Sequence, residues 1–379
     1  MSSERVMKPG TLRIGVIGLG WAGQQHMKAY DSIEGVQLVA IAGHEDHLRE
    51  ELGDRYDIAR DHRFVDFAEL LDVGDIDAIS IAVPTFLHAP IAIAALGKGV
   101  HVLTEKPIAA TVADAERMVE AARSSGRVLE VVFNHRLRGD VQMLGRRMRE
   151  GGLGVPYFAS ASWLRRDGIP QLGGWFTNAG RSGGGPLIDL GVHVLDYSLF
   201  LLGEPAVESV SATTYSELGR QKARALTETA ARAGRDGEGI AQPRPSREVS
   251  FEVEDFASAF MRLEGGGTLV LQTSWAAYRD PADRIDFQVL GTDGGARLTD
   301  DAGARHLVIH RNRDGRVADE KLTPPANAGH AGVVRNFVAT VQDPTTWKRH
   351  DGSIGLERAR IIDAAYRSAA AGHEIVMGT

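Results

Sequence analysis

The stretch TLRIGVIGLGWAGQQHM, residues 11–27, joins an apolar run to three glycines at fixed spacing. The run LRIGVI has the composition of a buried strand, and the residues from Trp21 onward predict a helix. Gly18, Gly20 and Gly23 leave no side chains where the strand turns into the helix. This spacing is typical of a turn at which the backbone approaches a pyrophosphate, and an ordinary tight turn is the alternative interpretation.

The composition describes a globular chain that is large enough for two domains. The sequence has 379 residues, of which 43% are hydrophobic and 25% charged. Its formal net charge of -7 gives no reason to expect nucleic acid or a membrane as a partner. The chain has no cysteine, which excludes disulfides, thiolate metal ligands and a thiol nucleophile. We find no signal-like or membrane-spanning apolar run and therefore expect a cytoplasmic protein.

Strand and helix patterns alternate through the first third of the chain. Strands are predicted over residues 12–17, 36–42, 77–83, 100–103 and 127–133, with helices between them. Such alternation predicts an α/β fold with a doubly wound parallel sheet and helices on both faces. Sheets of this kind bind ligands beyond the carboxyl ends of their strands.

Small and polar residues follow these strands at the edge where a ligand is expected. If the ligand is a dinucleotide, its pyrophosphate meets the N-terminus of the first helix. The predicted cofactor-binding residues are Gly18, Leu19, Gly20, Trp21, Ala22, Gly23, Gly43, His44, Val83, Pro84, Thr85, His88, Glu105, Lys106 and Asn134.

The end of the second strand bears on the choice between NAD and NADP. An acidic residue about twenty residues after the glycines usually binds the ribose 2′-hydroxyl of NAD. Gly43 stands there, so nothing repels a 2′-phosphate, and His44, His47 and Arg49 are near enough in sequence to help hold one. We predict NADP, with NAD as the alternative because Glu45 is close.

A second informative stretch, SGGGPLIDLGVHVLDYSLFLLGEP, predicts one buried helix over residues 186–203. Asp189, His193 and Asp196 interrupt its apolar pattern at spacings that place them on one face. Burying unpaired carboxylates is costly, so this face should meet a cleft, a partner or solvent. Gly191 in mid-helix suggests that something approaches the backbone.

An Asp-x-x-x-His pair can also ligate a metal ion. No third ligand is evident near Asp189 and His193 in the sequence, so we expect no metal.

Four motifs give the chain a resemblance to the Gfo/Idh/MocA oxidoreductase family. They are GVIGLGWAG, VPTFLHAPIAIAALGKGVHVLTEKPIA, GGGPLIDLGVHVLDYSLFLLG and GLERARIIDAAYRSAAAGHEIV. The resemblance implies a Rossmann domain over residues 1–133 and an α+β domain with a large, mostly antiparallel sheet over residues 134–379. It implies NAD- or NADP-dependent oxidation or reduction of a sugar, cyclitol or related polyol, by a homodimer or homotetramer. The C-terminal helices are expected to pack back near the first domain.

The resemblance also implies the catalytic residues Lys106, Asp189 and His193. Lys106 would stabilise a developing alkoxide, His193 would take the hydroxyl proton, and Asp189 would orient the substrate or assist the imidazole. Whether Lys106 or His193 transfers the proton stays open. A non-enzymatic nucleotide-binding regulator of the same fold is the alternative, although all three residues are present. A different nucleotide-binding enzyme, such as a methyltransferase, gives no role to the EKP motif, which is Glu105, Lys106 and Pro107.

The second domain adds further substrate-binding candidates. Aromatic rings stack on sugars, so Trp175 and Phe176 are predicted to line the pocket with Arg166, whereas Trp163 is assigned to packing. Residues 216–248 are polar and predict an insertion with a partial helix and a loop, which would cap the cleft or contact a neighbouring subunit.

Overall fold

The computed structural model describes residues 11–233, 249–313 and 315–378, which form two compact units. The first unit comprises Met1–Leu137 and Ala328–Ala359, and the second comprises Arg138–Asn327 and Arg360–Thr379. The division drawn from the sequence at residue 134 placed residues 328–359 in the second domain. Their place in the first unit follows from packing, as described below.

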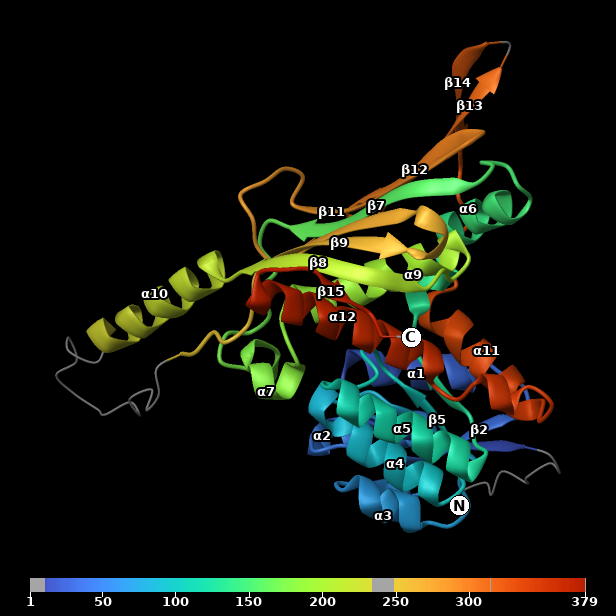
Figure 1. The fold of residues 1–379 in the computed structure, drawn as a ribbon. Helices are drawn as coiled ribbons and strands as arrows, with labels where there is room; N and C mark the ends of the chain where they lie inside the picture. Colours follow the sequence, from blue (N-terminus) through green and yellow to red (C-terminus); the bar gives the residue numbers. More distant parts are fainter. Residues whose placement is uncertain (1–10, 234–248, 314, 379) are drawn as a thin grey trace. The chain divides into compact units, whose positions relative to one another are not determined.

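The first unit contains a parallel sheet with the strand order β3-β2-β1-β4-β5-β6 (Figure 1). This order confirms the predicted doubly wound Rossmann sheet. The predicted bounds of the first two strands match the structure, whereas the very short β3 was not predicted. The strands are β1 (Leu12–Ile17), β2 (Val36–Ala42), β3 (Arg63–Phe64), β4 (Ala78–Ile81), β5 (His101–Thr104) and β6 (Leu129–Val131).

Helices cover both faces of this sheet, because alternate side chains of its buried strands point to opposite faces. Ile79 of β4 joins a core with α4 and α5, which lie side by side (Figure 1), whereas Ala78 joins a core with α1. The helices are α1 (Trp21–Asp31), α2 (Asp46–Arg55), α3 (Phe67–Asp72), α4 (His88–Gly97) and α5 (Val112–Ser125). Helix α5 ends at Gly126, which adopts the left-handed conformation that glycine favours at a helix C-terminus.

Residues 328–359 complete the first unit. Helix α11 (Gly329–Gln342) buries Val334 and Phe337 in the same core as Ile14 and Val16 of β1. It therefore covers the α1 face of the sheet. The boundary between the units falls within α12 (Ser353–Ala371), after Ala359.

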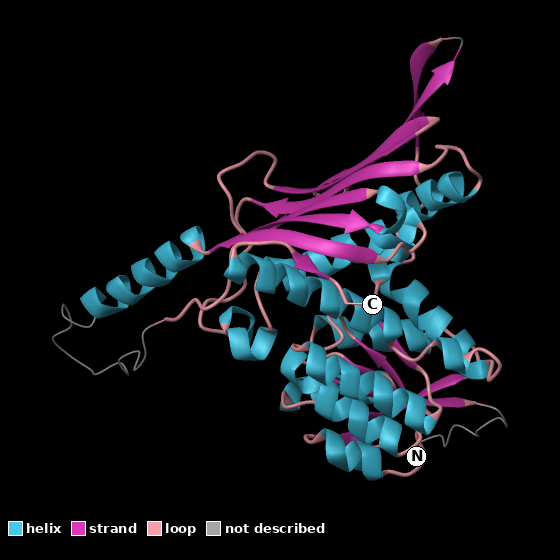
Figure 2. Cartoon of the chain, viewed as in Figure 1, coloured by secondary structure: helices cyan, strands magenta, loops and turns pink. Residues whose placement is uncertain are grey.

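The second unit contains a sheet in the order β14-β13-β12-β11-β7-β10-β9-β8-β15. Its pairs are antiparallel apart from β10 with β7, which confirms the predicted mostly antiparallel sheet (Figure 2). The strands are β7 (Pro156–Arg165), β8 (Val207–Tyr215), β9 (Phe256–Leu263), β10 (Thr268–Ser274), β11 (Asp283–Gly291), β12 (Gly294–Asp301), β13 (Ala304–Arg313), β14 (Arg316–Leu322) and β15 (Ile375–Val376).

One face of this sheet is buried beneath helices. Ala161, Leu271 and Phe287 on that face are buried, while Phe158 and Val270 on the opposite face stay partly exposed. Helices α8 (Pro186–Asp189) and α9 (Gly191–Leu202) pack on β7, β9 and β10, and α6 (Gly139–Arg149) packs on β12 and β13. The other helices of this unit are α7 (Ala179–Ser182), α10 (Glu217–Ala233), which extends away from the sheet in Figure 1, and the end of α12. Helix α10 occupies the first half of the predicted insertion, and residues 234–248 lie outside the described residues.

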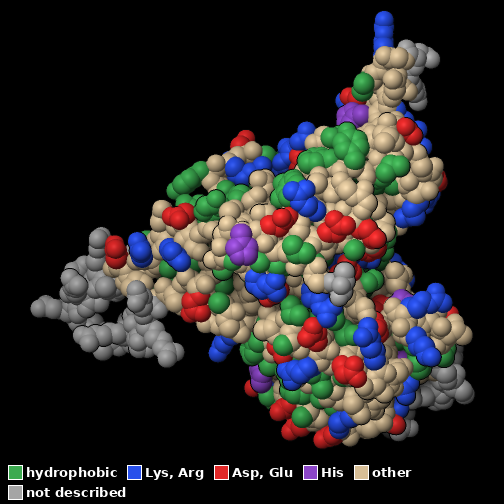
Figure 3. All heavy atoms as spheres, in the orientation of Figure 1, with side chains coloured by type: hydrophobic (Ala, Val, Ile, Leu, Met, Phe, Trp, Pro, Cys, Tyr) green, Lys and Arg blue, Asp and Glu red, His purple; other side chains and the backbone are tan. Residues whose placement is uncertain are grey.

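Among the described residues, no single helix is both long and apolar enough to cross a membrane. The bent pair of segments 179–189 and 191–202 passes that test only when its two parts are combined, and most of the second part is buried in the second unit. On the face shown in Figure 3, acidic and basic side chains are interspersed over the described part of the surface.

Candidate functional site

Two of the three glycines after β1 are required by packing alone. Gly18 has a φ of +96°, and a Cβ there would lie 2.2 Å from the carbonyl oxygen of Ala82. A Cβ on Gly23 would lie 1.9 Å from the carbonyl oxygen of Gly18. Both positions therefore need glycine whether or not a ligand binds.

Gly20 is different, because no residue that the structure describes requires it to be glycine. Its φ of -67° suits any residue, and an added Cβ would meet no atom of the described residues within 4 Å. Gly20 caps α1, whose first turn has no acidic residue, and Trp21 beside it is 68% exposed. An open backbone at a helix N-terminus fits an anionic group such as a pyrophosphate.

At the end of β2, the structure gives Gly43 a packing partner. A Cβ there would lie 2.8 Å from Cγ of Leu19, whose side chain is buried. Arg49 donates a hydrogen bond of 2.7 Å to the carbonyl oxygen of Gly43 and pairs with Asp46. The Arg49 guanidinium thus braces this turn, while the His44 side chain is exposed.

The loop after β4 is tied to the EKP turn by His88. Its Nδ1 lies 2.9 Å from the carbonyl oxygen of Pro107 and its Nε2 2.9 Å from that of Val83. Burial lowers the pKa of His88. Thr85 is also buried, whereas Pro84 is half-buried. His88 therefore contributes by holding two loops together rather than by presenting a free ring nitrogen.

Glu105 is a buried carboxylate at the end of β5. Its Oε1 lies 3.2 Å from Nε2 of His26 and 3.3 Å from Nε2 of His330, and its Oε2 accepts a 3.2 Å hydrogen bond from the backbone N–H of Lys106. Burial by itself would raise the pKa of Glu105, but the two imidazoles hold it well below its usual range. Glu105 is therefore ionised.

His26 and His330 were not predicted from the sequence. His26 lies on α1 and is fully buried, while His330 is the second residue of α11 and its ring lies 5.2 Å from that of Trp21 between centroids. The amide of Asn134 reaches Nδ1 of His330 at 3.4 Å. A histidine three residues after Gly23 was the one available signal, and nothing in the sequence around His330 marks it.

In the second unit, the prediction of one helix over residues 186–203 is wrong. The chain forms α8 and α9, separated at Leu190, and the segments on either side are bent by 47°. Gly191 is the first residue of α9, and a Cβ there would lie 3.3 Å from Thr273 of β10. The element that approaches its backbone is the sheet of the same unit.

The expected polar face is consequently divided between two helices. Asp196 is fully buried and His193 is 8% exposed, whereas Asp189 ends α8 and is partly exposed. Trp275 donates a hydrogen bond of 2.9 Å from Nε1 to Oδ2 of Asp189. The ring of Trp163 lies against that of His193 at 5.9 Å between centroids.

Aromatic side chains extend from this pair. Phe176 stacks on Trp175 at 3.8 Å and meets the edge of Trp275 at 6.5 Å between ring centroids. Phe176, Trp163 and Ala223 of α10 pack in one apolar cluster with Trp275. The structure therefore joins the predicted Trp175 and Phe176 to Asp189 through Trp275, which the sequence analysis did not single out.

Arg166 is engaged elsewhere in the second unit. It donates hydrogen bonds of 2.6 Å to the carbonyl oxygen of Arg279 and 2.7 Å to the carboxylate of Asp280. Its guanidinium therefore braces the loop before β11.

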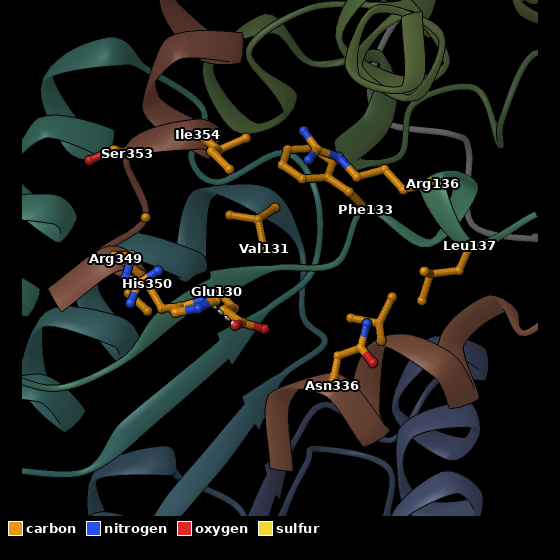
Figure 4. A pocket seen from close by; sticks show the side chains of 14 residues that line it. Glu130, Val131, Phe133, Arg136, Leu137, Asn336, Arg349, His350, Ser353 and Ile354 are labelled. Carbon is orange, nitrogen blue, oxygen red and sulfur yellow. Dashed lines mark ion pairs between the residues drawn. The ribbon is translucent and has the colours of Figure 1, made fainter. Parts of the chain in front are cut away.

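The first unit also has a cavity of about 190 Å³ beside β6, which Figure 4 shows from close by. Glu130 and His350 pair there at 2.7 Å, and this hydrogen bond raises the pKa of His350. Arg136, whose guanidinium lies over the ring of Phe133, is another lining residue. None of the described lining residues is a predicted cofactor-binding residue.

The comparisons with known proteins agree with this architecture. Residues 12–133 match the family described as "Oxidoreductase family, NAD-binding Rossmann fold", and residues 141–297 match its C-terminal domain. The D-glucoside 3-dehydrogenase of Escherichia coli (strain K12) is 30% identical over 98% of this chain and 99% of its own length. The chain belongs to the Gfo/Idh/MocA oxidoreductase family.

Other members are similar over most of their length. The D-apiose dehydrogenase of Paraburkholderia graminis is 27% identical over 95% of this chain and 88% of its own. The aldose-aldose oxidoreductase of Caulobacter crescentus, solved with glycerol, has a TM-score of 0.76 at 23% identity and covers 97% of this chain and 100% of that one. A levoglucosan dehydrogenase solved with NADH and levoglucosan has a TM-score of 0.77 at 21% identity, with 97% and 100% covered.

These two structures establish the fold alone. Family membership makes the chain a nicotinamide-dependent oxidoreductase acting on CH–OH groups, rather than a non-enzymatic regulator. The chain's own residues fit a dinucleotide, because the backbone is open at Gly20 and Oδ1 of Asn134 is buried without a hydrogen-bond partner among the described residues.

Proposed function

We propose that this oxidoreductase interconverts a secondary hydroxyl group of a sugar, cyclitol or related polyol and the corresponding ketone. The open backbone of Gly20 at the N-terminus of α1 is the observation that carries this proposal. Packing of the described residues does not require glycine at this position, whereas the close approach of a pyrophosphate does. Trp21, Glu105, Lys106 and Asn134 are the further residues that we assign to the cofactor, while Thr85 and His88 support their loops.

NADP is the proposed cofactor. Gly43 presents no carboxylate to repel a 2′-phosphate, and the exposed His44 follows it. Arg49 adds positive charge to the same turn, although Asp46 offsets part of it. NAD is the second candidate, supported by the family description.

We propose that the substrate contains a pyranoside ring. One relative aligned over nearly the whole chain is named for the 3-position of D-glucosides. The stacked rings of Trp175 and Phe176 supply an apolar, aromatic wall of the kind that packs on a sugar ring. We leave Arg166 out of this pocket, because its guanidinium is engaged by Arg279 and Asp280.

The bound nicotinamide supplies the hydride acceptor. In the oxidative direction the carbinol C–H bond breaks, its electron pair leaves as hydride, and the O–H proton goes to His193. Asp189, held by Trp275, orients the substrate hydroxyl. The Lys106 ammonium stabilises the negative charge that develops on the oxygen. The reductive direction reverses these steps.

We also propose that the chain is a homodimer or homotetramer. Phe158, Val270 and Phe260 lie on neighbouring strands and on the sheet face opposite to α9, where they stay partly exposed. Light scattering on the purified protein measures the assembly, and substitution of Phe260 by lysine is expected to weaken it. A wild-type monomer would overturn this part of the proposal.

The first experiment is titration of the purified chain with NADH and with NADPH, followed by fluorescence. A redox screen with glucosides, free sugars and cyclitols then uses the preferred cofactor. Tight NADPH binding and a turnover that Lys106→Ala abolishes are the expected results. Preference for NADH would overturn the NADP assignment alone, and a folded chain that binds neither dinucleotide would overturn the proposed function.

A further inference from the structure

A buried cluster in the first unit brings two imidazoles onto one carboxylate. His26 comes from α1, Glu105 from the end of β5 and His330 from the start of α11. The side chains are 0%, 12% and 14% exposed, respectively. Buried polar side chains cost free energy unless they are hydrogen-bonded or paired with an opposite charge. Three of them together in an apolar core therefore indicate a role other than packing.

Both imidazoles in this cluster turn Nε2 towards Oε1 of Glu105. Asn134 Nδ2 carries the hydrogens of its amide, so Nδ1 of His330 accepts at 3.4 Å and Nε2 of His330 carries the ring hydrogen towards Glu105. His26 likewise turns its Nε2 towards the same Oε1. Nε2 of each histidine therefore lies near one and the same carboxylate oxygen.

This arrangement leaves the second oxygen for a ligand. Oε2 accepts the backbone N–H of Lys106 and has further lone pairs to offer. Oε1 of Glu105 and both ring nitrogens of His26 are buried without an aligned hydrogen bond to any residue that the structure describes. A buried carboxylate whose hydrogen bonds are incomplete suits a site that is completed by a hydroxyl-bearing ligand.

We propose that His26 and His330 are positioning residues, which hold Glu105 ionised and oriented so that it accepts hydrogen bonds from the hydroxyls of the nicotinamide ribose. This inference rests on the proposed function, in which Glu105 contacts the cofactor. The two histidines act through Glu105 and touch no reacting atom.

The test is dinucleotide affinity in single and double variants of the full-length chain. His330→Leu is expected to raise the Kd of the preferred dinucleotide about ten-fold, which corresponds to about 1.4 kcal/mol, with kcat at saturating cofactor nearly unchanged. His330→Gln keeps an N–H donor at similar reach and should restore most of the affinity. His26→Gln and His26→Leu repeat the comparison, should one leucine variant fail to fold.

A double-variant cycle separates positioning from a purely structural role. Glu105→Gln alone should weaken binding, and adding His330→Leu to it should weaken binding no further, because the histidine acts through the carboxylate. His350→Leu is the matched control, since His350 also pairs with a carboxylate of the first unit, that of Glu130. Its Kd should equal that of the wild type.

Three results would overturn the inference. One is an unchanged Kd in folded His330→Leu, and another is full additivity with Glu105→Gln. The third is a stoichiometric metal ion in the purified protein that His330→Leu removes, since the three ligand atoms lie within 4.8 Å of one another and form a possible metal-binding set. A wild-type chain that binds neither dinucleotide would instead count against the proposed function itself.

Discussion

The indole of Trp275 donates a hydrogen bond of 2.9 Å to Oδ2 of Asp189, and so joins the residue after β10 to the last residue of α8. Trp275 is fully buried and packed against Phe176, so its N–H has a fixed direction. The proposed substrate-orienting carboxylate is thereby fixed by the sheet rather than by its own short helix.

Removing that donor should impair turnover but not cofactor binding. Trp275→Phe is expected to lower kcat/KM about ten-fold, because hydrogen bonds to charged groups contribute about 1.5–3 kcal/mol. Steady-state kinetics and a dinucleotide titration measure the two effects. Trp347→Phe removes an indole hydrogen bond of 3.1 Å in the first unit and serves as the control. Equal kinetic losses in both variants would contradict the assigned role of Trp275.

The glycine turn offers a comparison between two neighbouring positions. Gly20→Ala adds a Cβ in open space, so it should cost no more than about 1 kcal/mol of stability and yet raise the dinucleotide Kd at least about ten-fold. Gly23→Ala meets the Gly18 carbonyl oxygen and should destabilise the first unit by about 3 kcal/mol. Urea unfolding and cofactor titration distinguish them. Normal affinity in Gly20→Ala would argue that the turn is structural only.

Cofactor preference should depend on the charge at the end of β2. Gly43→Asp is expected to weaken NADPH binding at least about ten-fold relative to NADH, because its carboxylate repels a 2′-phosphate. The new Cβ also presses on Leu19, so Gly43→Asn, with similar size and no charge, controls for packing. An equal change in the ratio of NADPH to NADH affinity in both variants would show that the size of the new side chain, and not its charge, causes the effect.

Replacing His193 should affect chemistry more than binding. His193→Asn is expected to lower kcat about 100-fold or more with little change in dinucleotide Kd, because general-base catalysis contributes factors of this order. Single-turnover kinetics with the best substrate from the redox screen provides the measurement. A loss confined to KM would assign His193 to substrate binding and leave Lys106 as the proton-transfer group.

The Glu130–His350 pair should make stability depend on pH. Because the pKa of His350 is raised in the folded state, its contribution is fully present below about pH 6.5 and is lost as the pH rises through the folded value. The free energy of unfolding of the wild type should therefore exceed that of His350→Gln by a larger amount at about pH 6 than at about pH 9. His350 is 36% exposed, so the difference stays below about 1 kcal/mol. Urea unfolding at both pH values tests this, and equal differences would contradict it.

Local patterns predicted much of the first unit. The strands β1 and β2 have the predicted bounds, because buried apolar runs next to glycine turns leave few alternatives. The two-residue β3 was missed, since a strand of that length is formed by its partner in the sheet and carries no pattern of its own.

Sequence patterns predicted less where packing between distant residues decides the structure. The apolar run over residues 186–202 satisfied the rules for one helix, and Gly191 was the one local signal of the break at Leu190. Arg166 follows a strand, which is a typical position for a binding residue, but its guanidinium donates a hydrogen bond to Asp280, which is distant in the sequence. Charge and spacing do not identify such partners.

By itself, the sequence determined the alternation of strands and helices, the glycine turn and the EKP motif, because each depends on residues adjacent along the chain. Only the tertiary structure decided that α11 completes the first unit and that Glu105 lies between His26 and His330. The physical reason is that a buried carboxylate needs compensating donors, and those donors come from whichever elements the core packs beside it.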